Sequence, residues 1–112
     1  MEDLRIEVGP NQGGVQIFKL IGPFTIGTMF DFQALMREHK PPVTLLDLSG
    51  VPYMDSAALG ALLGVHVSSQ RENRKFALVA PSDRLKTLFE VAGVNGVLHI
   101  YPSQEAAKTA VA

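Results

Sequence analysis

The run Val43–Leu48 constrains the fold more than any other segment of the chain. It is an almost continuous apolar stretch, Val-Thr-Leu-Leu-Asp-Leu, with one acid near its end. A strand with one wet face alternates apolar and polar residues, whereas an apolar run of this length is typical of a strand buried on both faces. The segment is therefore predicted to be a buried, central strand of a sheet.

Two strand patterns precede this run. Leu4–Val8 alternates apolar and charged residues, and Val15–Ile21 is a second, more apolar strand pattern. The residues between them, Gly-Pro-Asn-Gln-Gly-Gly, are dense in turn formers. This spacing predicts a hairpin, with the first strand antiparallel and at an edge of the sheet.

Helix and strand patterns then alternate along the chain. Thr28-x-x-Asp31 has the form of a capping box and predicts the start of a helix that ends near Glu38 or His39, before two prolines. Gly93 is predicted to stop a later helix, and Ser103 is predicted to cap the last one. The remaining predicted elements are a helix from Asp55 or Ser56 to Gln70, strands at 76–79 and 97–101, a helix around 85–92 and a helix from 103 to about 110.

The predicted order is thus β-β-α-β-α-β-α-β-α. Alternating strands and helices imply right-handed crossovers between parallel strands. The predicted fold class is α/β, with a small mixed, mostly parallel five-stranded sheet packed with about four helices. The length of 112 residues fits a single domain spanning 1–112.

Composition excludes several classes of function. The chain has no cysteine, which rules out disulfides, thiolate metal sites and a cysteine nucleophile. A net charge of −1 gives no bulk attraction to nucleic acid or to an anionic membrane. The longest apolar stretch, 57–67, is about half of what a membrane span needs, and no signal peptide is visible. A cytoplasmic protein without a membrane segment is expected.

Polar side chains gather where the central strand is predicted to end. Ligands of such sheets sit beyond the carboxyl ends of the strands, and Asp47, Ser49, Asp55 and Ser56 all fall there. A hydrolase reading of Ser56 is disfavoured, because the nearest histidine in sequence, His66, would lie about 15 Å away along the same helix.

Other chemistry is weakly supported. A phosphoacceptor role for Asp47 would need further acids at neighbouring strand ends, and the second strand ends in Ile-Gly-Pro. Asp47 is instead expected to accept hydrogen bonds from backbone amides of its own loop. The histidines at 39, 66 and 99 have no metal-site spacing, and no phosphate-binding glycine motif is present. We therefore expect no catalytic residue, no metal and no cofactor.

Ser56 has two compatible interpretations. A serine at the start of a helix is most often a cap, whose oxygen accepts a hydrogen bond from an amide of the first turn. The same position also suits a phosphate, because a helix N-terminus stabilises negative charge. The helix that follows is apolar almost all round in its first three turns. We therefore expect part of its N-terminal half to be an interface with another protein.

The stretch Asp47-Leu48-Ser49-x-Val51-x-x-Met54-Asp55-Ser56-x-x-Leu59-Gly60 resembles the signature of STAS domains, in particular bacterial anti-sigma factor antagonists. The resemblance implies that Ser56 is phosphorylated by an anti-sigma factor serine kinase, which carries the ATP. The unmodified chain would bind that kinase, the phosphorylated chain would release it, and a phosphatase would reset the switch. The partner-binding residues implied are Asp47, Ser49, Asp55, Ser56, Ala57, Ala58, Leu59 and Leu62.

The chain departs from the family pattern at two places. Ala57 and Ala58 follow Ser56, where relatives usually have Ser or Thr and then Gly. Gly22-Pro23-Phe24 stands where many relatives have a glycine and an acidic pair. Two alternatives stay open at this point: a constitutive scaffold module of a stress-sensing or lipid-transport complex, and a small-ligand sensor. The sequence also leaves open whether the apolar helix forms a homodimer.

Overall fold

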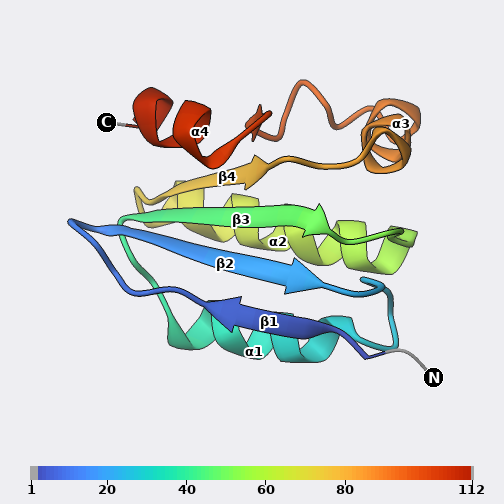
Figure 1. The fold of residues 1–112 in the computed structure, drawn as a ribbon, viewed down its shortest axis with the longest axis horizontal. Helices are drawn as coiled ribbons and strands as arrows, with labels where there is room; N and C mark the ends of the chain where they lie inside the picture. The colour runs from blue at the N-terminus through green and yellow to red at the C-terminus, as the bar shows by residue number, and fades with distance from the viewer. Residues whose placement is uncertain (1–2, 112) are drawn as a thin grey trace.

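Val43–Gly50 forms β3, the middle strand of a five-stranded sheet (Figure 1). The structure, a computed structural model, describes residues 3–111. The strands lie in the order β1-β2-β3-β4-β5; β1 is antiparallel to β2, and the other neighbours are parallel. The other elements are β1 (Arg5–Val8), β2 (Val15–Ile21), α1 (Met29–Glu38), α2 (Ser56–Arg71), β4 (Lys75–Val79), α3 (Asp83–Val91), β5 (Ile100–Tyr101) and α4 (Gln104–Val111).

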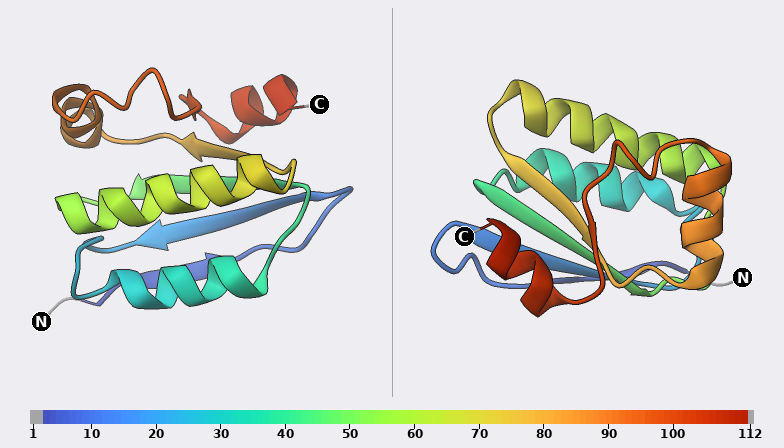
Figure 2. Two further views of the ribbon diagram at one scale, coloured as in Figure 1. Left: turned by 180° about the vertical axis from the view of Figure 1, so that it is seen from behind. Right: turned by 90° about the horizontal axis from the view of Figure 1, so that it is seen from above.

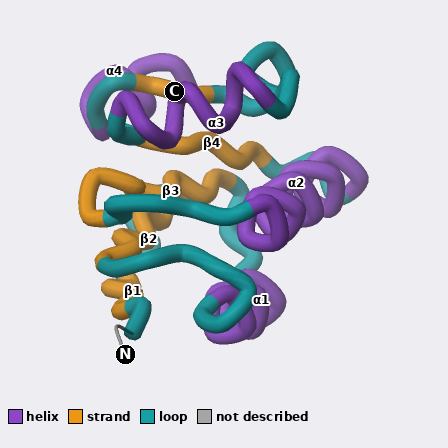
Figure 3. The backbone as a smooth tube through the Cα atoms, turned by 90° about the vertical axis from the view of Figure 1, so that its right-hand side faces the viewer, coloured by secondary structure: helices purple, strands orange, loops and turns teal. Residues whose placement is uncertain are grey.

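The helices cover the two faces of the sheet unequally. Figures 2 and 3 show α1 and α2 side by side on one face and α4 on the other, with α3 beyond the carboxyl ends of the strands. Alternate residues of β3 serve the two layers: Leu46 and Leu48 belong to the large core under α1 and α2, and Leu45 to the smaller one under α4. This two-sided burial is what an apolar central strand requires.

The predicted fold class, the β1–β2 hairpin and the central position of β3 are confirmed. Two strand boundaries differ from the prediction by two or more residues. β3 continues to Gly50, two residues further than predicted. β5 contains only Ile100 and Tyr101, because the amides of Val97 and Leu98 both donate to the carbonyl of Val94 and form turns instead of a strand.

The helix ends also test the sequence prediction. Gly93 stops α3 as predicted, with a φ of 72°, and the Ser103 hydroxyl accepts from the Ala106 amide at the start of α4. The capping box at Thr28 is wrong, because its hydroxyl donates back to the Pro23 carbonyl (2.8 Å) and accepts from the Thr25 amide (3.0 Å). The Thr28 side chain therefore stabilises the β2–α1 loop and does not cap α1.

Within residues 3–111, no helix has both the length and the hydrophobicity needed to cross a membrane.

Two glycines on the exposed face of α2 have no packing role among the described residues. A Cβ built at Gly60 or Gly64 would meet none of their atoms within 4 Å. Gly64→Ala should therefore raise the free energy of unfolding by about 0.5–1 kcal/mol, because alanine favours the helix and restricts the unfolded chain. Urea denaturation would measure the gain.

Gly22→Ala should lower the free energy of unfolding. Gly22 has a φ of 115°, and a Cβ at this position would lie 2.5 Å from the Asp3 carbonyl oxygen.

Candidate functional site

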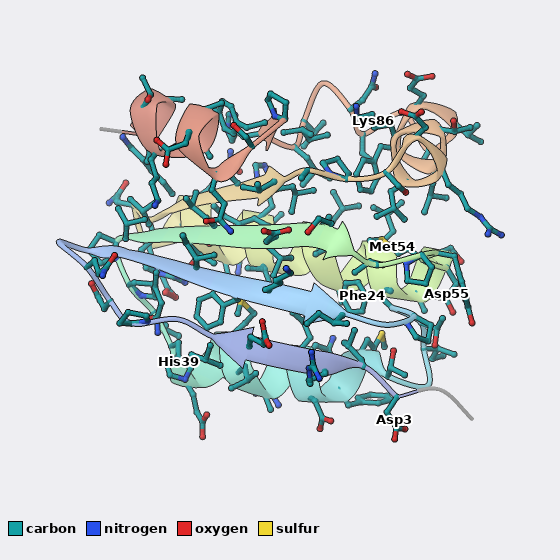
Figure 4. All side chains as sticks on the ribbon, in the orientation of Figure 1. Asp3, Phe24, His39, Met54, Asp55 and Lys86 are labelled. Atoms are coloured by element: carbon teal, nitrogen blue, oxygen red, sulfur yellow. The ribbon has the colours of Figure 1, made fainter. Side chains whose placement is uncertain are left out.

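The candidate site lies beyond the carboxyl ends of β2 and β3. Figure 4 shows Phe24, Met54 and Asp55 gathered at this end of the sheet, with His39 at the opposite end. Phe24 and Met54 pair as an isolated parallel bridge, and the Phe24 amide donates to the Tyr53 carbonyl (3.1 Å). The β2–α1 loop and the β3–α2 loop are therefore joined by backbone hydrogen bonds, which gives the site a fixed frame.

Asp55, and not Ser56, caps α2. One carboxylate oxygen of Asp55, Oδ1, accepts from the Ala58 amide at 2.9 Å, and Oδ2 accepts from the Ile26 amide at 2.9 Å. The first bond satisfies an amide at the helix N-terminus, and the second ties the β2–α1 loop to it. The capping interpretation of Ser56 is therefore wrong. Ser56 is the first residue of the helix, its hydroxyl takes no part in the cap, and the residue is exposed.

Apolar side chains are exposed around this helix start. Ile26 is 60% exposed, and Phe30, in the first turn of α1, is 62% exposed. Tyr53, three residues before Ser56, is 40% exposed, and the Arg84 guanidinium lies 5.6 Å from the centre of its ring. Large apolar side chains exposed close together mark a protein-binding surface more often than isolated ones do. We call Ile26, Phe30, Tyr53, Ser56 and Ala57 the docking surface.

The predicted partner-binding residues do not all reach this surface. Ala58, Leu59 and Leu62 are buried in the core on the inner face of α2. Ser56 is exposed and Ala57 half-buried, so the outer face of the first turn is the accessible part of the helix. Ala58, Leu59 and Leu62 thus hold the helix against the core. The part of α2 that a partner could contact is therefore smaller than the sequence indicated.

Asp47 and Ser49 lie on the α4 side of the sheet. Asp47 is only 6% exposed; its Oδ1 accepts from the Ser49 amide (2.9 Å) and its Oδ2 from the Gln104 side chain of α4 (2.8 Å). The expected bond to its own loop is confirmed, and the bond to Gln104 fastens α4 to the sheet. Ser49 is exposed and lines a shallow groove of about 660 Å³ with Arg5 and Ser82.

The pKa of Asp47 is lowered despite its burial. Burial alone would raise it, but the hydrogen bonds from Ser49 and Gln104 and the positive charge of Lys19 on β2 outweigh that effect. Because the pKa in the folded chain lies below the ordinary value of 3.8, the folded state binds this proton less readily than the unfolded state. Asp47 therefore stabilises the fold fully above that value, and the contribution is lost as pH falls through the lowered pKa.

Asp47→Asn should show this dependence. We expect the free energy of unfolding to fall by about 1–2 kcal/mol at neutral pH, because a charged acceptor of two hydrogen bonds is lost. The difference between variant and parent should shrink on acidification, as the parent loses the same contribution. Urea denaturation at neutral and acid pH measures both. Asp31→Asn, on the exposed side of α1, is the control and should change stability by less than about 0.5 kcal/mol.

The chain resembles known proteins over most of its length. Residues 9–107 match the model of the STAS domain. The chain belongs to the STAS domain family. An anti-sigma-B factor antagonist of Staphylococcus aureus is 26% identical over 82 residues, which cover 73% of this chain and 76% of that protein. The resemblance inferred from the motif around Asp55 and Ser56 is thereby confirmed at the level of the family.

Several solved structures share the fold. An anti-sigma factor antagonist from Mycobacterium paratuberculosis superimposes with a TM-score of 0.84 at 22% identity, over 96% of this chain and 93% of that one. The Bacillus cell fate determinant SpoIIAA, solved in a phosphorylated form, gives a TM-score of 0.72 at 14% identity over 95% and 99% of the two chains. The murine anion transporter Slc26a9 gives 0.78 at 15% identity, with 97% of this chain but 22% of the transporter covered. One fold thus serves both regulators and transporters.

The sequence analysis pointed to the same end of the sheet but did not point to Ile26, Phe30 and Tyr53 of the docking surface. Ile26, Phe30 and Tyr53 lie in loops or at a helix start, where periodicity assigns no face. The sequence contains one signal that could have indicated them. Ile26 and Phe30 are apolar residues close to Thr25 and Thr28, after Gly22-Pro23 ends the strand pattern.

Proposed function

We propose that this chain is an anti-sigma factor antagonist that binds an anti-sigma factor of the serine-kinase type and is released when that kinase phosphorylates Ser56. In this proposal the chain catalyses nothing itself. The partner supplies ATP and the phosphoryl transfer, and a phosphatase restores the unmodified state in the cytoplasm. The proposal is supported by the relatives named anti-sigma factor antagonists and by the match to the STAS family.

The observation that carries the proposal is that Asp55, and not Ser56, caps α2. Asp55 caps α2, so the Ser56 hydroxyl is exposed and free of any structural duty in the cap. A kinase can therefore approach the hydroxyl without unwinding the helix. The substitution of alanines at 57 and 58 for the family's usual residues does not disturb this start, since α2 begins at Ser56 with both in helical conformation.

The docking surface explains how a phosphate would break the complex. A phosphoserine carries about −1.5 to −2 charges at neutral pH. On Ser56 it would stand next to Asp55, whose carboxylate holds the backbone of the exposed Ile26. A partner seated on the docking surface would have to desolvate the new charge, which is costly without a matching cation. The helix N-terminus stabilises the negative charge of the phosphate, so α2 stays folded and it is the binding of the partner that is weakened.

Direct binding tests this function. The purified chain is titrated by calorimetry into the serine-kinase anti-sigma factor encoded in the same genome, alone and in complex with its sigma factor. The proposal expects saturable binding with one chain per kinase site, and appearance of free sigma factor on gel filtration. Tyr53→Ala should weaken binding strongly, whereas Val91→Ala, another exposed apolar residue on α3, should not. No binding by the well-folded chain would refute the assignment.

A constitutive scaffold role remains the second candidate. The STAS fold is also part of the transporter Slc26a9, which shows that the fold alone does not require a phosphate switch. In a scaffold, Ser56 would be an ordinary exposed residue, and a negative charge there would hardly alter partner binding. Partner binding by the variants Ser56→Asp and Ser56→Ala therefore separates the two functions.

A further inference from the structure

A pocket lies at the β4 edge of the sheet, at the other end of α2 from Ser56. It has a volume of about 270 Å³ and lies between the C-terminal half of α2 and the last residues of α4. Ser69 is thirteen residues after Ser56, which corresponds to about 20 Å along the helix axis. The residues that define this edge pocket are His66, Ser69, Phe76, His99 and Tyr101, with Arg74 and Lys75 beside them.

The pocket exists because β5 is short. β4 begins at Lys75, but β5 begins only at Ile100, which pairs with Leu78. The amides of Leu78 and Ala80 donate to the carbonyls of His99 and Tyr101 at 2.8 and 2.9 Å. Because alternate amides of a strand point to the same side, the Phe76 amide faces that same edge, at a level where β5 has not begun. The sequence prediction of a longer strand, 97–101, would have closed this opening.

A buried hydroxyl in the pocket lacks a partner. Ser69 is 1% exposed, and its Oγ has no hydrogen-bond partner among the described residues. Leaving a buried hydroxyl unpaired is destabilising, so such groups usually bind a ligand or an ordered water. The neighbouring Ser68 is exposed, so Ser69 is buried because it lies on the inner face of the helix.

The charged residues that line the pocket are basic, but one of them is already paired: the Arg74 guanidinium donates to the Glu72 carboxylate at 2.8 and 3.0 Å. The His66 ring is buried, and its centre lies 6.1 Å from that of His99. Arg74 and Lys75 stand at the rim, and none of the described lining residues is acidic. Burial lowers the pKa of His66, and the charge of His99 lowers it further, so the ring is kept neutral while the pocket has no negative charge in it. No local pattern predicts this pair, because the two histidines are 33 positions apart in the chain.

We propose that the edge pocket binds a small organic carboxylate. Its carboxylate accepts hydrogen bonds from the Ser69 hydroxyl, the Phe76 amide and the His66 ring, with Lys75 supplying positive charge at the rim. Its apolar body lies against Tyr101 and Ala77. The volume is just below the range of pockets that hold drug-sized molecules, so the ligand has about the size of benzoate. This inference does not depend on the proposed function, because the ligand would not touch the docking surface.

Titration by ¹⁵N-edited NMR tests the site with benzoate as the probe, benzamide as its uncharged isostere and inorganic phosphate as a bare oxyanion. We expect saturable shifts of the Ser69, Phe76 and His99 amides with benzoate, and binding at least about tenfold weaker for benzamide and phosphate. Ser69→Ala should weaken benzoate binding about tenfold, whereas Ser68→Ala should leave it unchanged. The spectra themselves show that each variant is folded.

Three results would overturn the proposal. The first is the absence of saturable shifts with benzoate, which would leave a bound water as the partner of Ser69. The second is equal binding of benzoate and benzamide, which would show that the pocket does not recognise the carboxylate. The third is a Ser69→Ala variant that binds as tightly as the parent chain.

Discussion

Ser56→Asp is expected to weaken binding to the anti-sigma factor by at least about 2 kcal/mol, or roughly thirtyfold. The new carboxylate would be added at the exposed first position of α2, beside the Asp55 carboxylate and among the apolar side chains of the docking surface. The partner would then bury an uncompensated charge. Calorimetric titration of the variant and the parent chain against the same kinase measures the difference.

Two matched variants control this experiment. Ser56→Ala should bind about as tightly as the parent chain and should not be releasable by ATP. Ser68→Asp places the same charge on the exposed face of the same helix, three turns away, and should leave binding unchanged. If Ser56→Asp binds like the parent, the switch is wrong and the scaffold alternative is favoured.

Asp55→Ala is expected to lower the free energy of unfolding by about 2–3 kcal/mol. The substitution removes the α2 cap, worth about 1 kcal/mol, and also the hydrogen bond from the Ile26 amide to a charged oxygen, worth about 1.5 kcal/mol. Urea denaturation measures the loss. Because Ile26 is part of the docking surface, the variant should also bind the partner more weakly than its stability alone explains.

Asp55→Asn separates the two hydrogen bonds. Its side-chain oxygen can still cap the Ala58 amide, but the amide nitrogen cannot accept from Ile26. We expect about half the loss of stability, with faster hydrogen exchange at the Ile26 amide and unchanged exchange at Ala58. A loss below about 0.5 kcal/mol in Asp55→Ala would contradict the role given to this carboxylate as the link between the loop and the helix.

Much of the fold could be predicted because its signals are local or periodic. The apolar run at 43–48 placed the central strand, and the turn formers before Val15 gave the hairpin. Gly93 and Ser103 acted at helix ends through their own backbone and side-chain preferences. The errors arose where a competing local bond was stronger than the pattern. Thr28 bonds back to its loop, and the turn at Val94 shortens β5.

The candidate site was predicted less completely, because it depends on contacts between distant segments. The motif identified Ser56 and Asp55, but the bond from the Ile26 amide to Asp55 spans 29 residues. This bond holds the backbone of the exposed Ile26 at the start of α2. The link from Asp47 to Gln104 spans 57 residues and fixes α4, and no periodic pattern anticipates either contact. The edge pocket is hidden for the same reason.

The most direct test of the account is to map the phosphate after the chain is incubated with the serine-kinase anti-sigma factor and ATP. Tandem mass spectrometry should find one phosphate, on Ser56, and none on the Ser56→Ala variant. The phosphorylated chain should no longer elute with the kinase on gel filtration. A chain that binds the kinase but stays unmodified, or carries its phosphate elsewhere, for example on Ser49 or Ser68, would contradict the account.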